Sequence, residues 1–374
     1  MNVAGFAFAH LYLSVPADGE LPADHWAGAL LRELDLRTDR AGFTRPLRSL
    51  LVGGEAPEAL GAELPQRVRQ VTGTSLDGIG EWTVEVSDPR IPGSVIGSWL
   101  AGGVTRLSLR GAAATPGSLV RLAAICEGRV ALGVDLTLES GAREAGAVGA
   151  RIEELVGLGA GSLAFVETEP VAGSGSGPPS AVSRSAADAI ADPEWNRAAW
   201  LAAVDAIQRL GWTFLDLAFA YRPGPCPVHP RAIVRRHPVL GLGPAAVTFR
   251  HPHRRWNHAD ARPYLEAIHG NEDPMAGSES LTRAEGRLER CWAALRSTRG
   301  LPIPAASCAS TPWFRRWQRA NWVQPAVAPD GGRNRLRLSR EGLLVADGLA
   351  VELALELERI QRGGVDGSPR VPEL

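Results

Sequence analysis

The alternation of short apolar runs with helix-length segments restricts the fold of this chain more than any other feature. Most strand-like runs are separated from the next by a segment long enough for a helix, such as Trp26–Leu36. A crossover helix returns the chain to the same edge of the sheet, so such units build parallel sheets. The pattern predicts an α/β fold with a parallel sheet or barrel. The runs are Phe6–Val15, Leu47–Val52, Thr83–Val86, Arg106–Leu109, Val130–Leu136 and Ser162–Val166.

A break in this pattern suggests where the first domain ends. The run Trp212–Ala220 predicts one more strand, and a proline-rich stretch follows it. We therefore expect a first domain over residues 1–222, a connecting segment over 223–275 and a C-terminal domain over 276–374.

The C-terminal part predicts a smaller, mainly helical module. Leu281–Leu295 has the length and spacing of a helix, and Arg335–Leu338 alternates like a short strand. Ser339 is placed to cap a long helix that runs through Ile360. Helix, strand and helix in this order suggest a winged-helix-like module, and a simple packing role is favoured over nucleic-acid binding.

Charge and composition exclude several classes of function. The net charge is −1, so no global attraction to nucleic acid or to acidic membranes is expected. All 40 basic residues are arginine, which excludes a lysine Schiff base and a P-loop lysine. No uninterrupted apolar stretch reaches the roughly 18 residues of a membrane span. The cysteines at 126, 226, 291 and 308 are scattered, which favours a reducing, cytoplasmic location over a disulfide framework.

Several strings, in order along the chain, resemble one enzyme family. They are LLVGGEAPEAL at Leu50–Leu60, TVEVSDP at Thr83–Pro89, LAGGVTRLSL at Leu100–Leu109, RRWNHADARPYL at Arg254–Leu265 and LRLSREGLLVADGLAVEL at Leu336–Leu353. The family is that of oxygen-independent coproporphyrinogen III dehydrogenase and its haem-chaperone relative, HemW. The resemblance implies a partial (β/α)6 radical-SAM-type barrel followed by a C-terminal, mainly helical, winged-helix-like domain.

The cysteines required by the family's chemistry are missing. The family carries Cys-x-x-x-Cys-x-x-Cys directly after its first strand, where three thiolates hold a [4Fe–4S] cluster that binds SAM. The matching stretch here, Pro16–Asp24, contains no cysteine. The chain therefore resembles a degenerate member, for which we expect neither the cluster nor SAM.

Some residues of the SAM-binding segments remain. Gly53 and Gly54 survive, but Glu55-Ala56 replaces the third glycine and the threonine of the family motif. Glu85 also survives on the third strand. By resemblance these three form a remnant SAM site, although Glu85 also suits a plain polar strand end. Asp135 and Glu169 fall at family-like strand ends and are equally suited to lining a remnant cavity.

Cys226 and His229 are the candidate haem ligands. By resemblance, His229 stands where the haem chaperone has the histidine of a His-Asn-x-x-Tyr-Trp motif, but Pro230, Ile233 and Val234 replace its companions. Cys226 precedes a proline, and a thiolate in such a loop can bind ferric iron. The competing interpretation is a proline-rich loop with an incidental cysteine and histidine.

Two further segments are weaker candidates for a binding site. The run from His251 to His258 includes Arg254 and Arg255, which suit the propionates of a tetrapyrrole, but a solvated loop is the favoured interpretation. The segment Trp313–Trp322 is aromatic and basic. Its helical spacing favours packing, with a partner-protein surface as the next choice.

Three functions remain open at this point. The first is a catalytically inactive protein that binds or delivers haem, another tetrapyrrole or a protein partner. The second is an active coproporphyrinogen oxidase-type enzyme with non-standard cofactor ligation. The third is a structural subunit of a larger complex.

The absence of thiolates from Pro16–Asp24 generates the first prediction. Anaerobic reconstitution with iron and sulfide should yield protein without [4Fe–4S] absorbance, because the loop offers the iron no thiolate ligands. Iron and sulfide content and the visible spectrum measure this. A stoichiometric cluster, or cleavage of SAM to 5′-deoxyadenosine above a no-protein control, would show that the assignment as a degenerate member is wrong.

Overall fold

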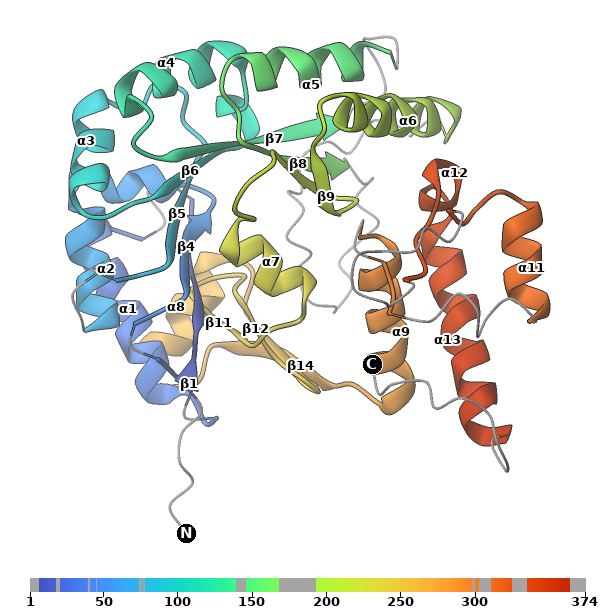
Figure 1. Cartoon of the computed structure of the whole chain (residues 1–374). Coiled ribbons are helices and arrows are strands. Elements are labelled where there is room, and N and C mark those ends of the chain that lie inside the picture. Colours follow the sequence, from blue (N-terminus) through green and yellow to red (C-terminus); the bar gives the residue numbers. More distant parts are fainter. Residues whose placement is uncertain are drawn as a thin grey trace.

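The fold is built on a large mixed sheet with helices along one side (Figure 1). The computed structural model describes residues 7–17, 21–39, 41–44, 46–73, 76, 78–138, 146–167, 193–297, 300–302, 311–324 and 335–363. Within them, twelve strands form one sheet in the order β14-β13-β12-β11-β2-β4-β5-β6-β7-β8-β10-β9. Two short strands, β1 (Ala7–Phe8) and β3 (Gly42–Phe43), pair separately.

The centre of the sheet consists of parallel strands joined by helices. The strands are β2 (His10–Val15), β4 (Ser49–Gly54), β5 (Glu81–Val86), β6 (Arg106–Leu109), β7 (Ala131–Leu138) and β8 (Ser162–Glu167). Each is parallel to the next. The helices are α1 (Ala23–Leu36), α2 (Leu64–Thr72), α3 (Gly93–Ala101), α4 (Pro116–Cys126), α5 (Ala147–Gly157) and α6 (Pro193–Arg209). The α/β prediction is confirmed, whereas closure into a barrel stays a prediction.

The main core lies between the sheet and these helices. Alternate strand residues point toward the helices because successive side chains on a strand face opposite sides of the sheet. On β2 these are Leu11, Leu13 and Val15, all buried in the main core. Trp26 of α1 and Trp99 of α3 close the core from the helix side. Figure 1 shows the strands along an arc, with α1 to α6 outside it. The other face of the sheet is therefore the inner face.

Two antiparallel strands end the sheet beyond β8. The sequence predicted one strand over Trp212–Ala220, which is wrong: the chain forms β9 (Thr213–Asp216) and β10 (Phe219–Tyr221), paired with each other. The Asp216 carboxylate accepts the N–H of Ala218 at 2.7 Å. This local hydrogen bond turns the chain within an otherwise apolar run.

The other end of the sheet comes from a segment whose strands the sequence did not predict. β11 (Val239–Leu242) is parallel to β2, and β12 (Val247–Arg250), β13 (His253–Asn257) and β14 (Met275–Ser280) follow in antiparallel order. The helix α8 (Ala261–His269) lies between β13 and β14 in the chain and packs on α1. Residues within 223–275 are thus hydrogen-bonded into the main sheet.

Glu33 joins this extension to the first helix. Its side chain is fully buried and accepts hydrogen bonds from the Gly243 N–H at 2.8 Å, the Asn257 amide at 2.8 Å and the Tyr264 hydroxyl at 3.0 Å. Arg37, also fully buried, lies 3.6 Å from it. Burial raises the pKa of Glu33, while these donors oppose the rise. One carboxylate therefore connects α1, the turn after β11, β13 and α8.

The C-terminal helices enclose a second core. They are α9 (Arg283–Leu295), α11 (Pro312–Arg319), α12 (Arg340–Leu343) and α13 (Ala346–Gly363). Trp313, Phe314 and Trp317 of α11 are buried in this core, which supports the packing interpretation of that segment. Ser339 caps α12, so the long helix expected from this residue is divided in two. The winged-helix comparison stays a prediction, and no helix among the described residues is long and apolar enough to cross a membrane.

Removing the Glu33 carboxylate should strongly destabilise the protein. Glu33→Ala removes the buried acceptor of three donors and one of the two carboxylates beside Arg37, which keeps its pair with Asp39, at a cost of about 3–5 kcal/mol. Glu266→Ala on α8 is the control, since its pair with Arg262 is exposed and should contribute less than about 1 kcal/mol. Urea unfolding measures both. Equal losses would show that the buried carboxylate is not a structural centre.

Candidate functional site

The inner face of the parallel sheet carries the densest group of polar side chains near strand ends. Its members alternate with the core residues of the same strands: Tyr12, Ser14, Thr83, Glu85, Arg106, Ser108 and Asp135. Two glycines, Gly53 and Gly133, occupy the same face. Side chains at the carboxyl ends of adjacent parallel strands meet at one edge, where α/β proteins bind their ligands. The inner face is therefore the candidate site.

Glu85 and Arg110 form an ion pair at this edge. The Arg110 Nη1 donates to Glu85 Oε2 at 2.6 Å and to the Gly54 carbonyl at 2.9 Å. The same Glu85 oxygen accepts the Gly54 N–H at 3.3 Å. A Cβ on Gly53 would stand 2.4 Å from this oxygen, so the glycine makes room for the carboxylate. The structure thus brings Gly53, Gly54 and Glu85 together with Arg110, while their role as a remnant SAM site stays a prediction.

Asp135 is a partly buried carboxyl next to this pair. Burial and then the neighbouring Glu85 charge raise its pKa to about 7, and Arg110 and Arg106 partly offset the rise. A carboxyl with this pKa exchanges its proton near neutral pH, which makes it both a donor and an acceptor.

Arg106 is a buried cation on the same face. Its Nη2 donates to Ser162 Oγ at 2.6 Å, and its guanidinium lies 5.5 Å from the ring centre of Phe219 on β10. A Cβ on Gly133 would stand 2.6 Å from Nη2, so the absence of a side chain at Gly133 makes room for the guanidinium. Burial lowers its pKa, which Glu81 and Asp135 oppose.

The amino ends of the strands hold a second polar cluster beneath α7 (Val228–Val234), and Arg106, the first residue of β6, lies between the two groups. The Glu81 carboxylate accepts the N–H groups of Val228 at 2.8 Å and His229 at 2.9 Å, which caps this helix. Ser49 Oγ lies 2.8 Å from His10 Nδ1 and 2.9 Å from His229 Nδ1. Burial lowers the pKa of His10 to about 4 and that of His229 to about 3.

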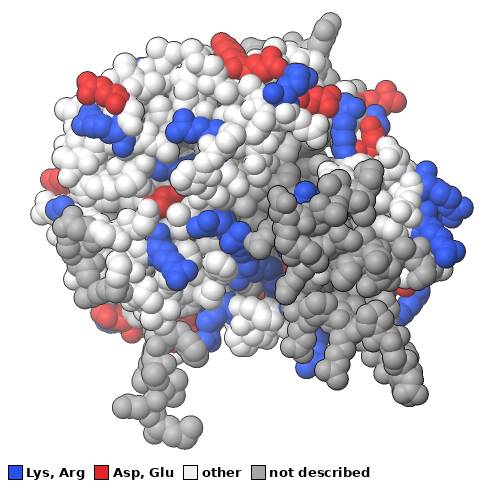
Figure 2. Space-filling model, viewed as in Figure 1, with Lys and Arg blue, Asp and Glu red and all other residues white. Residues whose placement is uncertain are grey.

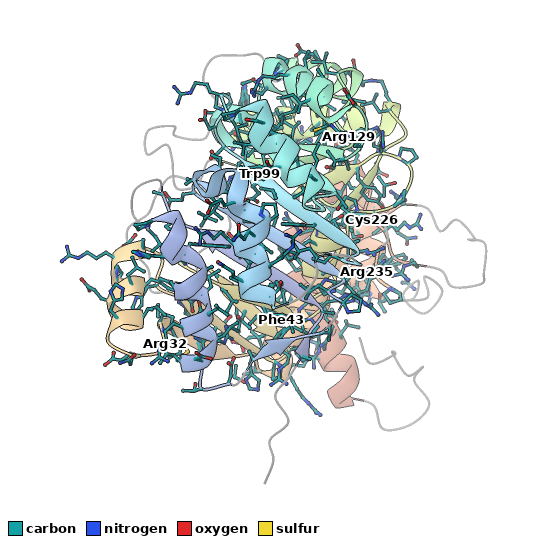
Figure 3. All side chains as sticks on the ribbon, turned by 90° about the vertical axis from the view of Figure 1, so that its left-hand side faces the viewer. Arg32, Phe43, Trp99, Arg129, Cys226 and Arg235 are labelled. Atoms are coloured by element: carbon teal, nitrogen blue, oxygen red, sulfur yellow. The ribbon has the colours of Figure 1, made fainter. Side chains whose placement is uncertain are left out.

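The predicted haem ligands therefore differ in accessibility. His229 is only 1% exposed and lies in α7, not in an open loop as the sequence suggested. Cys226 is half-buried just before α7, and burial raises the pKa of its thiol. Figure 3 labels Cys226 and Arg235 near each other, and Arg231 and Arg235 oppose the rise in the thiol pKa. The role of Cys226 and His229 in haem binding stays a prediction.

The other sequence candidates lie elsewhere. Arg254 pairs with Glu279 and Glu289, and Arg255 pairs with Asp273, so both arginines are neutralised within the protein. Among the described residues, no three His, Cys, Asp or Glu side chains gather closely enough to hold a metal ion. Glu169 and Cys308 lie outside the residues that the structure describes.

Sequence reasoning did not select Arg106, Arg110 or Tyr12 as site residues. A signal was present, since polar residues occupy every second position of strands that are otherwise apolar. It was missed because a parallel sheet is usually covered on both faces by apolar packing. In this protein the inner face is polar instead.

Comparisons with known proteins support the fold. No protein-family model and no curated protein matches the chain. The structure resembles that of coproporphyrinogen III oxidase (HemN) from Escherichia coli, which is described as a radical SAM enzyme. The similarity covers 93% of this chain and 90% of that chain, with a TM-score of 0.65 and 14% sequence identity. The chain thus shares the overall α/β fold of that enzyme, whereas the barrel, the winged-helix-like domain and kinship with HemW stay predictions.

Asp135 should make the stability of the protein pH-dependent. Its folded pKa, raised to about 7, lies above the unfolded value of 3.8, so its contribution declines as pH rises through 7. Asp135→Asn removes this penalty, and relative to wild type the variant should gain about 2–3 kcal/mol more at pH 8 than at pH 5. Urea unfolding at both pH values measures the difference.

Asp88→Asn is the matched control. Hydrogen bonds from Arg90 hold the pKa of Asp88 below 3.8, so both pH values lie above its titration and the effect should be the same at each. A pH-independent effect of Asp135→Asn would contradict the raised pKa of the carboxyl.

Proposed function

We propose that this chain is a non-catalytic radical-SAM-like protein that binds a tetrapyrrole on the inner face of its sheet. The proposal is based mainly on the Arg110 guanidinium, which donates hydrogen bonds to the Glu85 carboxylate and the Gly54 carbonyl. By resemblance these groups belong to a remnant SAM site. Arg110 already donates hydrogen bonds to both groups. They are therefore poor acceptors for the ammonium group of SAM.

The residues present do not fit a [4Fe–4S] cluster. The cluster needs thiolates at one point, and the loop after β2 has none. Cys126 is buried in the main core and Cys291 in the second core, so these two belong to different parts of the fold. Cys226 lies just before α7, which covers the amino ends of the strands, whereas the loop after β2 begins at a carboxyl end. These positions support a non-catalytic role.

The chemistry of the inner face suits a tetrapyrrole. The enzyme with the similar structure is named for its action on coproporphyrinogen III. A molecule of this class presents carboxylates at its edge and pyrrole N–H groups at its centre. Arg110 is partly exposed and binds Glu85 and Gly54 through Nη1, so its other guanidinium N–H groups can donate to a carboxylate, and Asp135 provides an acceptor for N–H groups. Both kinds of group lie on one face of the sheet.

Haem ligation by Cys226 and His229 is a second form of this proposal. Cys226 is the more accessible ligand, although its raised pKa means that iron must displace a proton. His229 would have to give up its hydrogen bond to Ser49 and leave its buried position before it reached an iron. We therefore expect the thiol to dominate any haem spectrum.

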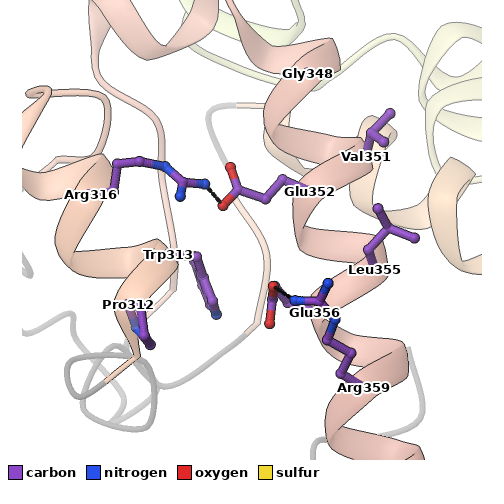
Figure 4. Close-up of a pocket in the computed structure, with 9 residues that line it drawn as sticks. All are labelled: Pro312, Trp313, Arg316, Gly348, Val351, Glu352, Leu355, Glu356 and Arg359. Carbon is purple, nitrogen blue, oxygen red and sulfur yellow. Dashed lines mark hydrogen bonds and ion pairs between the residues drawn. The ribbon is translucent and has the colours of Figure 1, made fainter.

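A role as a structural subunit is the second candidate function. A groove between α11 and α13, which exposes Val351 and Leu355, favours it (Figure 4). The active-enzyme alternative has no observation in its favour at the strand ends, and iron and SAM-cleavage assays test it directly.

Tetrapyrrole binding should depend on the inner-face arginines. In a titration with coproporphyrin III, Arg110→Gln should weaken binding about tenfold, because a charge-assisted hydrogen bond to a carboxylate is lost. Arg90→Gln is the control, since Arg90 is 89% exposed and pairs with nearby Asp88. Porphyrin fluorescence measures both affinities. Absence of binding, or equal binding by all three proteins, would rule out the inner-face site.

A titration with ferric haem distinguishes tetrapyrrole binding on the inner face from haem ligation by Cys226. If Cys226 ligates the iron, Cys226→Ser should shift the Soret band, while Cys126→Ser in α4 should leave it unchanged. An unchanged band in both variants, together with the Arg110 effect on coproporphyrin III, would favour the metal-free form.

A further inference from the structure

Three arginines gather at α7, on the side of the sheet where the parallel strands begin. Arg231 lies in the last turn of α7, Arg235 caps its C-terminus, and Arg48 directly precedes β4. Arg48 and Arg235 are exposed, and Arg231 is partly exposed. Figure 2 shows basic side chains near the middle of the view, where α7 lies in Figure 1. These three residues define the α7 face.

The three guanidinium groups share one neighbour, His237. This histidine follows α7 in the chain, and its ring centre lies 5.8 Å from that of His10 at the start of β2. Burial lowers the pKa of His237, and the three arginines lower it further. The imidazole is therefore neutral near pH 7 and adds no charge of its own. The arginines nevertheless lie close enough to one another for their positive charges to repel.

No acid of the described residues compensates this charge. Arg48 and Arg231 have no ion pair within that part of the chain. The acid beneath α7 is Glu81, which is only 9% exposed. Its two carboxylate oxygens already accept the N–H groups of Val228 and His229. The α7 face thus has unpaired guanidinium groups at the surface, and an anion that binds there relieves their repulsion.

The neighbouring side chains favour a protein as the source of that anion. Surfaces that bind single-stranded nucleic acid add aromatic rings on which bases stack. The large exposed side chain of α7 is aliphatic instead, since Ile233 is 57% exposed. The nearby aromatic residue, Tyr221, hydrogen-bonds to the Cys226 thiol. Arginine together with exposed aliphatic groups is typical of surfaces that bind proteins.

We propose that the α7 face binds an acidic segment of a partner protein. Arg231 and Arg235 are four residues apart, which separates them by about 6 Å along α7. Carboxylates at every second position of an extended segment repeat at about 7 Å, so two of them can meet these arginines. Arg48 binds a third carboxylate. This inference does not depend on tetrapyrrole binding, because the inner-face site lies at the other ends of the strands.

The test uses the full chain and three labelled ligands. The first is a peptide in which glutamate alternates with serine, the second has lysine in place of glutamate, and the third is an oligothymidylate with the charge of the first. Fluorescence anisotropy should show micromolar binding of the glutamate peptide, weakened by added salt because charge pairing drives it. The lysine peptide should bind at least tenfold more weakly, and the oligothymidylate should bind more weakly than the glutamate peptide.

Variants locate the binding surface. Arg48→Gln and Arg231→Gln should each weaken binding of the glutamate peptide about fivefold, because each loses a charge-assisted hydrogen bond. Arg262→Gln is the matched control, since Arg262 is equally basic but 88% exposed and paired with Glu266 on α8. Urea unfolding supplies a second readout. Arg48→Gln should unfold at the same urea concentration as wild type or a higher one, because the substitution relieves repulsion and breaks no ion pair among the described residues.

Several outcomes would overturn the proposal. Equal binding of the two peptides, or equal effects of Arg231→Gln and Arg262→Gln, would show that the α7 face is not the site. Tighter binding of oligothymidylate than of the glutamate peptide would assign the face to nucleic acid. Unfolding of Arg48→Gln at a clearly lower urea concentration than wild type would give this arginine a structural role instead.

Discussion

The two faces of the parallel sheet have opposite chemistry, and the rest of the molecule depends on this division. Successive residues of a strand point to opposite sides, so Leu11 and Leu13 enter the core while Tyr12 and Ser14 face inward. Helices α1 to α6 cover the apolar face, and α7 covers the polar face only at the amino ends of the strands. Charged groups on the inner face must then satisfy one another, because unpaired charge is costly away from water. The pairing of Glu85 with Arg110 is the clearest result of this constraint.

This constraint connects the fold to the proposed function. The strand-end carboxylate and backbone carbonyl that the resemblance assigns to SAM are held by an arginine of the chain itself. The pKa of Asp135 lies near 7 because burial and Glu85 favour its neutral form, while two arginines favour its charged form. A face with guanidinium donors and a protonatable acceptor can bind a ligand with carboxylates and N–H groups without any reaction taking place. The groove of the C-terminal helices has a different character, because exposed aliphatic side chains and two ion pairs line it.

Glycine positions explain why charged side chains fit on the inner face. A Cβ on Gly53 would collide with the Glu85 carboxylate, and a Cβ on Gly133 would collide with the Arg106 guanidinium. Gly53 was singled out through the resemblance to a family motif, whereas Gly133 had no sequence signal. The difference shows how the family pattern found part of the site and how the remainder depended on contacts between strands.

The sequence by itself determined the strand–helix alternation, most strand positions and the absence of cysteine from Pro16–Asp24, because these follow from local periodicity and residue type. It also selected Gly53, Gly54 and Glu85, which the fold brings together. Only the tertiary structure decided that Arg110 pairs with Glu85, that His229 is buried under a helix capped by Glu81, and that residues 239–280 extend the sheet. These outcomes depend on contacts between residues far apart in the chain. Local periodicity carries no information about which distant partner satisfies a buried charge or an open strand edge.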